Sequence, residues 1–134
     1  MKYSLLFMLV LAQSAYSEEI NMDRFGASKV FCYWGYGVGA DETYEYKCIK
    51  NYMVNDLNYK QIYANTTVMG KLYCCLYMKY YAPDDFKKFA GELKKDNSTQ
   101  VEFMVGCKGS VITVDKVVER IETLVYDWVG TPVQ

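Results

Sequence analysis

The sequence of 134 residues contains no histidine. Serine and cysteine hydrolases commonly use histidine as the general base, so its absence argues against that catalytic class, and it excludes an imidazole-based zinc site. Two acidic pairs, Asp41-Glu42 and Asp84-Asp85, could still serve a carboxylate-only mechanism. Both stand where helices are expected to start, and acidic residues there stabilise the helix dipole. We therefore predict that the protein is not an enzyme and has no cofactor or metal.

The chain also lacks an excess of positive charge. Its 15 lysines and arginines stand against 16 aspartates and glutamates, which gives a formal net charge of -1. A surface that binds nucleic acid needs an excess of basic residues, and no basic amphipathic stretch of the kind that lies on anionic membranes is evident. We therefore expect no nucleic-acid partner.

Long hydrophobic runs are absent as well. The best candidate, residues 5–12, is much shorter than the roughly 20 apolar residues that cross a bilayer. It follows the basic Lys2 and precedes Ala15-Tyr16-Ser17, a small-x-small cleavage site, and this pattern is typical of a secretion signal. We predict a signal peptide over residues 1–17, no membrane span, and a single secreted, extracellular domain over residues 18–134.

Cysteine is the first residue type whose presence is informative. The five cysteines are Cys32, Cys48, Cys74, Cys75 and Cys107. In an oxidising compartment they predict two disulfides and one leftover thiol. Cys74 and Cys75 cannot face one partner, because neighbouring side chains on a helix diverge by about 100°. The spacing does not select among the remaining pairings. Our preferred arrangement bridges Cys32, Cys48, Cys75 and Cys107 and leaves Cys74 as a buried, inert thiol.

Apolar residues recur with helical spacing in every substantial segment. We expect a short helix after Ser28 over residues 29–34, and a second helix capped by Asp41 in which Tyr44, Cys48 and Tyr52 face inward. Two further helices are expected over residues 68–80 and from Pro83 to Leu93. A capping box of Asn97 and Gln100 predicts a helix that runs to Cys107, and a last helix is expected from Thr113 to Trp128. We therefore predict an all-α fold, a compact bundle of five or six short helices stapled by two disulfides.

Two sequons fit N-glycosylation of an exported protein. They are Asn65-Thr66-Thr67 and Asn97-Ser98-Thr99. Asn65 is expected near a helix start, and Asn97 overlaps the predicted capping box, so a sugar there would rearrange that cap. Both asparagines are candidate modification sites.

Aromatic residues are the main candidates for a surface that binds another molecule. The chain has 14 tyrosines, 2 tryptophans and 6 phenylalanines, and tyrosine and tryptophan are enriched among the energetic anchors of protein interfaces. Tyr33, Trp34 and Tyr36 crowd one segment, and Tyr77 and Tyr81 lie off the main apolar stripe of their expected helix. These five residues are the candidate interface. The same residue type also suits the wall of an apolar ligand pocket or a protein core.

The segment from Cys32 to Gly39 resembles the glycine-rich calcium loop of secreted phospholipases, and Cys74-Cys75 resembles their double cysteine. Those enzymes place a histidine and an aspartate just after the double cysteine. Here Leu76 and Tyr77 follow, so the catalytic residues of that family are missing.

Two families of exported helical proteins have a similar format. Insect odorant-binding proteins resemble the chain in size and acidity, which implies a carrier of small hydrophobic ligands as the alternative function. That family has six cysteines, of which the second and third are separated by three residues, a spacing that the five cysteines here do not contain.

The second family is the anopheline mosquito salivary proteins that include albicin and anophensin, which the chain is similar to in its overall format of a small, acidic, two-disulfide helical protein. This resemblance implies an inhibitor of a host protease cascade, either the alternative complement pathway or the kallikrein contact system. Such an inhibitor would act by binding an extracellular protein or protease complex of the host, without catalysis.

Overall fold

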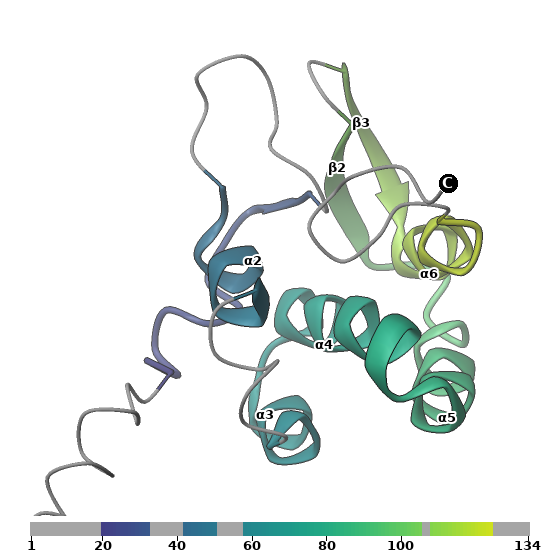
Figure 1. Cartoon of the computed structure of the whole chain (residues 1–134). Coiled ribbons are helices and arrows are strands. Elements are labelled where there is room, and N and C mark those ends of the chain that lie inside the picture. The colour runs from purple at the N-terminus through teal and green to yellow at the C-terminus, as the bar shows by residue number, and fades with distance from the viewer. Residues whose placement is uncertain (1–19, 33–41, 51–57, 106–107, 125–134) are drawn as a thin grey trace, which may run out of the picture.

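The computed structural model describes residues 20–32, 42–50, 58–105 and 108–124 (Figure 1). Its elements are β1 (Val30–Phe31), α2 (Tyr44–Cys48), α3 (Tyr59–Asn65), α4 (Val68–Tyr81), α5 (Pro83–Leu93), β2 (Gln100–Val105), β3 (Lys108–Thr113) and α6 (Val114–Glu122). The predicted signal peptide lies outside the described residues. Figure 1 shows α4 near the centre, with α2, α3, α5 and α6 around it and the strands β2 and β3 beside α6.

The predicted all-α class is wrong, because three segments form a sheet in the order β1-β2-β3. β1 pairs with β2 in parallel, with Phe31 opposite Phe103. β2 pairs with β3 antiparallel, with Glu102 opposite Val111. The protein is therefore a mixed fold in which helices pack against a small sheet.

The helix predicted from Asn97 to Cys107 is wrong, because Gln100–Val105 of this segment form the strand β2. Val101 and Phe103 are buried, and Glu102 between them is exposed. This alternation has the period of a strand with one buried face. Gly109, just beyond the predicted helix, is paired with Met104 inside the sheet.

The turn into β2 uses a different capping residue from the predicted one. The Asp96 carboxylate oxygen Oδ1 accepts hydrogen bonds from the backbone N–H groups of Ser98 at 3.1 Å and Thr99 at 2.9 Å. Asparagine and aspartate often close turns in this way. Asp96 therefore stabilises the turn between α5 and β2, and Asn97 is not a helix cap.

The short helix predicted over residues 29–34 is also wrong. Val30 and Phe31 form β1, whose partner β2 lies far along the chain. The Phe31 ring packs between Tyr73 of α4 and Phe103 of β2, at centroid distances of 4.6 and 6.0 Å. This strand depends on long-range pairing, which local periodicity does not reveal.

The central helix α4 confirms the prediction over residues 68–80. The Thr67 hydroxyl accepts a hydrogen bond from the Gly70 N–H at 3.2 Å and caps the start. The helix ends at Tyr81, because Ala82 precedes Pro83 and takes a non-helical conformation. All residues from 72 to 78 are buried. α4 is therefore a core helix that is covered on every side.

The helices α5 and α6 start where they were predicted. α5 begins with Pro83, and Asp84 and Asp85 lie in its first turn. α6 follows Thr113, and its buried residues are Val114, Val117, Val118 and Ile121. The helix ends at Glu122 with Thr123 as its C-cap, so the predicted continuation through Leu124 is wrong, and residues 125–128 lie outside the described residues.

The hydroxyl of Tyr73 joins three parts of the fold. It accepts hydrogen bonds from the Cys32 N–H at 2.9 Å and the Thr43 hydroxyl at 3.0 Å, and it donates to the Val30 carbonyl oxygen at 3.2 Å. A tyrosine hydroxyl has one donor and two acceptor sites, so all three are used. Burial raises the pKa of Tyr73, and the phenol stays protonated. This group ties β1 and the start of α2 to the central helix.

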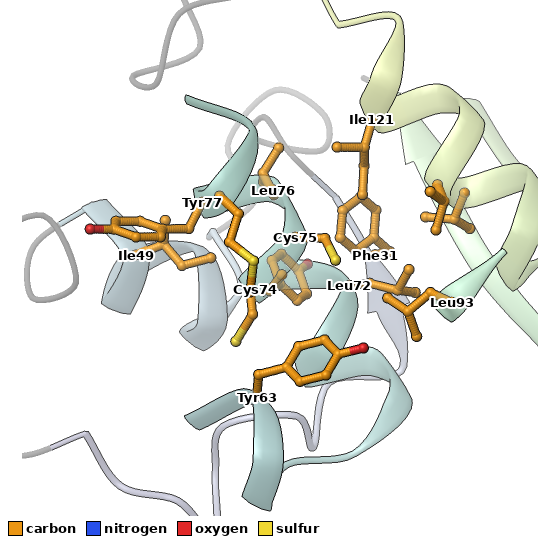
Figure 2. Close-up of a cluster of buried hydrophobic side chains, with 14 of the residues drawn as sticks. Phe31, Ile49, Tyr63, Leu72, Cys74, Cys75, Leu76, Tyr77, Leu93 and Ile121 are labelled. Carbon is orange, nitrogen blue, oxygen red and sulfur yellow. The ribbon is translucent and has the colours of Figure 1, made fainter. Parts of the chain in front are cut away.

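The two disulfides predicted to staple the fold are also not found. No disulfide is at bonding distance among the four described cysteines, Cys32, Cys48, Cys74 and Cys75, all of which are buried. Cys107 lies outside the described residues. As expected for helical neighbours, Cys74 and Cys75 point to different sides of α4 (Figure 2). In the described part, apolar packing around α4 takes the place of the cross-links that were expected.

Candidate functional site

The structure describes two of the five aromatic residues that the sequence predicts to form an interface, Tyr77 and Tyr81. Tyr33, Trp34 and Tyr36 lie outside the described residues. Tyr77 is fully buried, so its expected place at the surface is wrong: α4 is surrounded by other elements and has no exposed side at that position. Tyr81, one turn further along, is 44% exposed. Of the described candidates, Tyr81 is therefore the one that a partner can reach.

Tyr81 is the surface end of a stack of three tyrosines, which we call the tyrosine row: Tyr59, Tyr77 and Tyr81. The rings of Tyr59 and Tyr77 are 5.2 Å apart at 43°, and those of Tyr77 and Tyr81 are 5.0 Å apart at 29°. These distances are typical of attractive aromatic pairs. Because Tyr59 belongs to α3 and the other two to α4, the row joins both helices and holds Tyr81 against a buried ring.

The inner end of the tyrosine row meets two charged groups. The Tyr59 hydroxyl donates to Asp85 Oδ2 at 2.5 Å, and Lys60 Nζ lies 3.6 Å from the same oxygen. The hydrogen bond from Tyr59 lowers the pKa of Asp85, and the same bond, together with burial, raises the pKa of Tyr59 to about 12. At neutral pH the phenol therefore keeps its proton and the carboxylate keeps its charge. The hydrogen bond between Tyr59 and Asp85 then connects α3 with α5.

The arrangement suits recognition of another molecule. A tyrosine offers a large apolar body and a polar tip, and it loses little side-chain freedom when it binds. Stacking on Tyr77 restricts Tyr81 before any partner arrives, so the entropy cost of ordering this side chain on binding is reduced. The charged pair of Lys60 and Asp85 lies at the other end of the tyrosine row, against Tyr59.

The buried thiols lie away from this surface. Burial raises the pKa of Cys48 to about 11 and that of Cys75 to about 12, and it raises the pKa of Cys74 further. A thiol with a raised pKa holds little thiolate at neutral pH, and the thiolate is the reactive form. Cys74 was expected to be the odd, inert thiol, and the structure places it in the core with Cys48 and Cys75 in a similar environment.

The two sequon asparagines are both exposed. Asn65 is the last residue of α3, and its Nδ2 donates to the Gln61 carbonyl oxygen at 2.8 Å. Asn97 lies in the turn between α5 and β2. A sugar could leave the surface at either place, and its attachment stays a prediction.

The burial of two residues, Tyr59 and Glu45, was not predicted from the sequence. Tyr59 opens α3, a helix that was not predicted, although Tyr59, Ile62 and Tyr63 are buried at the i, i+3, i+4 spacing that marks a helix face. Glu45 in α2 is fully buried, and its Oε1 accepts a hydrogen bond from the Gly26 N–H at 3.2 Å. No signal in the sequence indicates that this carboxylate is inside.

In the part of the chain that the structure describes, no helix has the length and apolar character needed to span a membrane. Comparisons of the chain with protein families, with curated proteins and with solved structures find no match.

Proposed function

We propose that this chain is an exported, non-catalytic protein that binds an extracellular protein of a host through a surface centred on Tyr81. The observation that carries the proposal is the geometry of the tyrosine row. Tyr81 is exposed, and the buried Tyr77 stacks beneath it at 5.0 Å. Tyrosine is enriched among the residues that contribute most of the binding energy in protein interfaces.

Other exposed apolar side chains in the described part support the choice of Tyr81 by contrast. The large hydrophobic residues with substantial exposure are Met22, Tyr81 and Val111. Valine is under-represented among the residues that dominate binding energy, and tyrosine is enriched.

The partners to assay first are the protease complexes of the alternative complement pathway and of the kallikrein contact system. This choice rests on the small size and acidity shared with the anopheline salivary proteins and on the predicted secretion signal. The all-helical, disulfide-stapled format does not support it, because the fold is mixed. The proposed mechanism is occupancy of an extracellular protease assembly, in which the rigid anchor reduces the entropy cost of docking.

The experiment is capture from plasma by the immobilised mature protein, with mass spectrometry of the retained proteins. Tyr81→Ala should lose a specific partner that the unchanged protein retains. Val111→Ala is the matched control, since it also shortens an exposed apolar side chain but lies on β3. The proposal is contradicted if the unchanged protein retains nothing specific, or if both variants retain the partner equally.

The carrier function predicted as the alternative is tested in parallel. A carrier of small hydrophobic ligands should bind a fluorescent apolar probe with one-to-one stoichiometry, and unlabelled hydrophobic compounds should displace the probe. The proposed protein-binding function predicts no such saturable binding. A stoichiometric, displaceable signal would favour the carrier.

A further inference from the structure

Four lysines lie around one glycine near the C-terminal end of α5. Gly91 is exposed, and a side chain built on it would meet no atom within 4 Å. Lys87 and Lys88 precede Gly91 by four and three residues, Lys94 follows it by three as the C-cap of the helix, and Lys95 lies in the turn that follows. Residues three and four apart are neighbours on a helix surface, so Lys87, Lys88 and Lys94 flank the bare backbone at Gly91. We call these four lysines the lysine frame.

The lysine frame is a local concentration of positive charge on an acidic protein. All four of its lysines are exposed, although the chain has a formal net charge of -1. Lys94 forms an ion pair with Glu122 of α6, which raises the pKa of Lys94. Among the described residues, no ion pair involves Lys87, Lys88 or Lys95. A basic amphipathic face was not expected from the sequence, and the helix α5 provides one.

Acidic groups flank the frame, because Asp84 and Asp85 precede it, Asp96 follows it and Glu122 pairs with Lys94, whereas Glu92 is the one carboxylate between Lys87 and Lys95. The exposed carboxylates on α5 are Asp84, one turn before Lys87 and Lys88, and Glu92, next to Gly91. Asp85 is engaged by Tyr59 and Lys60. The helix dipole also opposes anion binding here, because the frame lies in the C-terminal half of α5. Attraction must therefore come from the lysine side chains.

We propose that the lysine frame binds a linear sulfated polysaccharide, with one sulfate group lying over Gly91 and its neighbours along the chain reaching the flanking lysines. Lys87 and Lys94 are seven residues apart, so the frame extends about 10 Å along the helix. A multivalent anionic chain can contact both ends at once, whereas a single small anion cannot.

The apolar side of α5 favours a polysaccharide over two other polyanions. Ala90 and Leu93 are buried, and Phe86 and Phe89 pack against the core, so the helix presents no apolar residues that could insert into a bilayer. Nor does it offer an exposed aromatic platform on which bases could stack. The choice of a sulfated extracellular polymer rests on the proposed export of the protein.

The first test places one charge at the centre of the frame. Gly91→Glu should weaken binding to heparin, a sulfated polysaccharide, about fivefold at about 0.1 M salt, as expected for one like-charge contact in water. Gly91→Gln is the matched control of the same size without the charge, and it should bind at least threefold more tightly than Gly91→Glu. Both variants should fold, because the position is open and either residue suits a helix better than glycine.

The second test measures the number of lysines involved. Lys87→Gln/Lys88→Gln should reduce the slope of log affinity against log salt by about two, whereas Lys47→Gln/Lys108→Gln, which removes the same charge from other exposed positions, should leave it unchanged. Glu92→Gln should strengthen binding, because it removes the carboxylate beside Gly91. Equal effects of the two lysine pairs, or equal binding by Gly91→Glu and Gly91→Gln, would overturn the proposed site.

The same purified proteins distinguish the ligand class and separate this inference from the protein-binding function. DNA of matched charge and vesicles containing phosphatidylserine should bind more weakly than heparin, and equal or tighter binding of either overturns the choice of a sulfated polysaccharide. Tyr81→Ala should keep full heparin binding while it loses the plasma partner. Loss of both activities in that variant would contradict the separation of the two surfaces.

Discussion

The neighbouring helices α4 and α5 bury their residues in opposite ways. In α4 every residue from 72 to 78 is buried, whereas in α5 the buried residues are Ala90 and Leu93 and the outer side carries lysines. A helix that is apolar all round belongs to the core, and one with a single apolar stripe lies at the surface. The spacing of apolar residues therefore predicts which side of α5 faces solvent. In α4 the same spacing indicates a helix, but it does not predict which residues are exposed.

The largest expected difference between the two helices is in thiol reactivity. Burial raises the pKa of Cys75 to about 12 from an ordinary value of 9.0, which lowers its thiolate fraction at neutral pH by about three powers of ten. In the folded protein, Cys74 and Cys75 should therefore react with iodoacetamide at least about 1000-fold more slowly than the thiol of Lys88→Cys on α5. A time course of labelling, read by peptide mass spectrometry, measures both rates.

Unfolding without reductant provides the control. Both α4 thiols should then be labelled within the time that labels Lys88→Cys. If Cys74 or Cys75 reacts as fast as the α5 thiol before unfolding, α4 is not covered on every side. If either stays unlabelled after unfolding, that cysteine is bonded in the protein.

The next largest difference is in the free energy of unfolding. Tyr77→Ala removes a buried ring that contacts both other members of the tyrosine row, so it should cost about 3–5 kcal/mol. Tyr81→Ala, at the exposed end of the row, should cost less than about 1 kcal/mol, and Lys88→Ala in α5 less than about 0.5 kcal/mol. Urea unfolding curves measure all three. Similar costs for Tyr77→Ala and Tyr81→Ala would show that Tyr77 is not in the core.

A matched pair of glycines should give changes of opposite sign. In α4, an alanine Cβ at Gly70 would lie 1.9 Å from the Thr66 hydroxyl oxygen and 2.8 Å from its Cβ, so Gly70→Ala should destabilise by about 1–3 kcal/mol. In α5, Gly91→Ala meets no atom within 4 Å and should stabilise by about 0.5–1 kcal/mol through helix propensity. Thermal unfolding of both variants checks the signs, and stabilisation by Gly70→Ala would contradict the close packing of α4.

The smallest expected effect concerns the hydrogen bond that connects α3 with α5. Tyr59 lowers the pKa of Asp85, so this bond stabilises the fold above the ordinary carboxyl pKa and its contribution disappears as the pH falls through the lowered value. Tyr59→Phe should therefore be slightly less stable than the unchanged protein at pH 7 and equally stable at low pH. Urea unfolding at a series of pH values measures this difference.

The alkaline side of the same profile has the opposite behaviour. The pKa of Tyr59 is about 12 in the folded protein and about 10 when unfolded, so the unchanged protein should lose stability as the pH rises through this interval. Tyr59→Phe lacks this titration. A difference between the two proteins that does not change with pH would contradict the Tyr59–Asp85 bond.

Local signals predicted part of the fold correctly. Thr67 and Pro83 mark the ends of α4 and the start of α5, and Thr113 precedes α6, because caps and proline act within one turn of the chain. The helix predicted over residues 97–107 failed although the strand pattern of Val101, Glu102 and Phe103 was present in the sequence. The capping-box match of Asn97 and Gln100 favours a helix, whereas this alternation favours a strand, and pairing with β1 and β3 stabilises the strand.

The candidate site was harder to predict than the helices. Tyr81 was predicted to be exposed and is, whereas Tyr77 was predicted to be exposed and is buried. Both lie off the apolar stripe of α4, so their positions on the helix do not distinguish them. What distinguishes them is Tyr59 of α3, which covers Tyr77 at 5.2 Å.

The sequence by itself determined the features that depend on near neighbours: the ends of α4 and α5, the start of α6, the divergence of Cys74 from Cys75 and the spacing of the lysines around Gly91. Only the tertiary structure decided that β1 pairs with β2, that α4 is covered on every side, and that its cysteines are packed without disulfides among the described residues. The physical reason is the range of the interactions. Caps and side-chain directions act within one helical turn, whereas strand pairing and burial depend on residues that lie far apart in the chain.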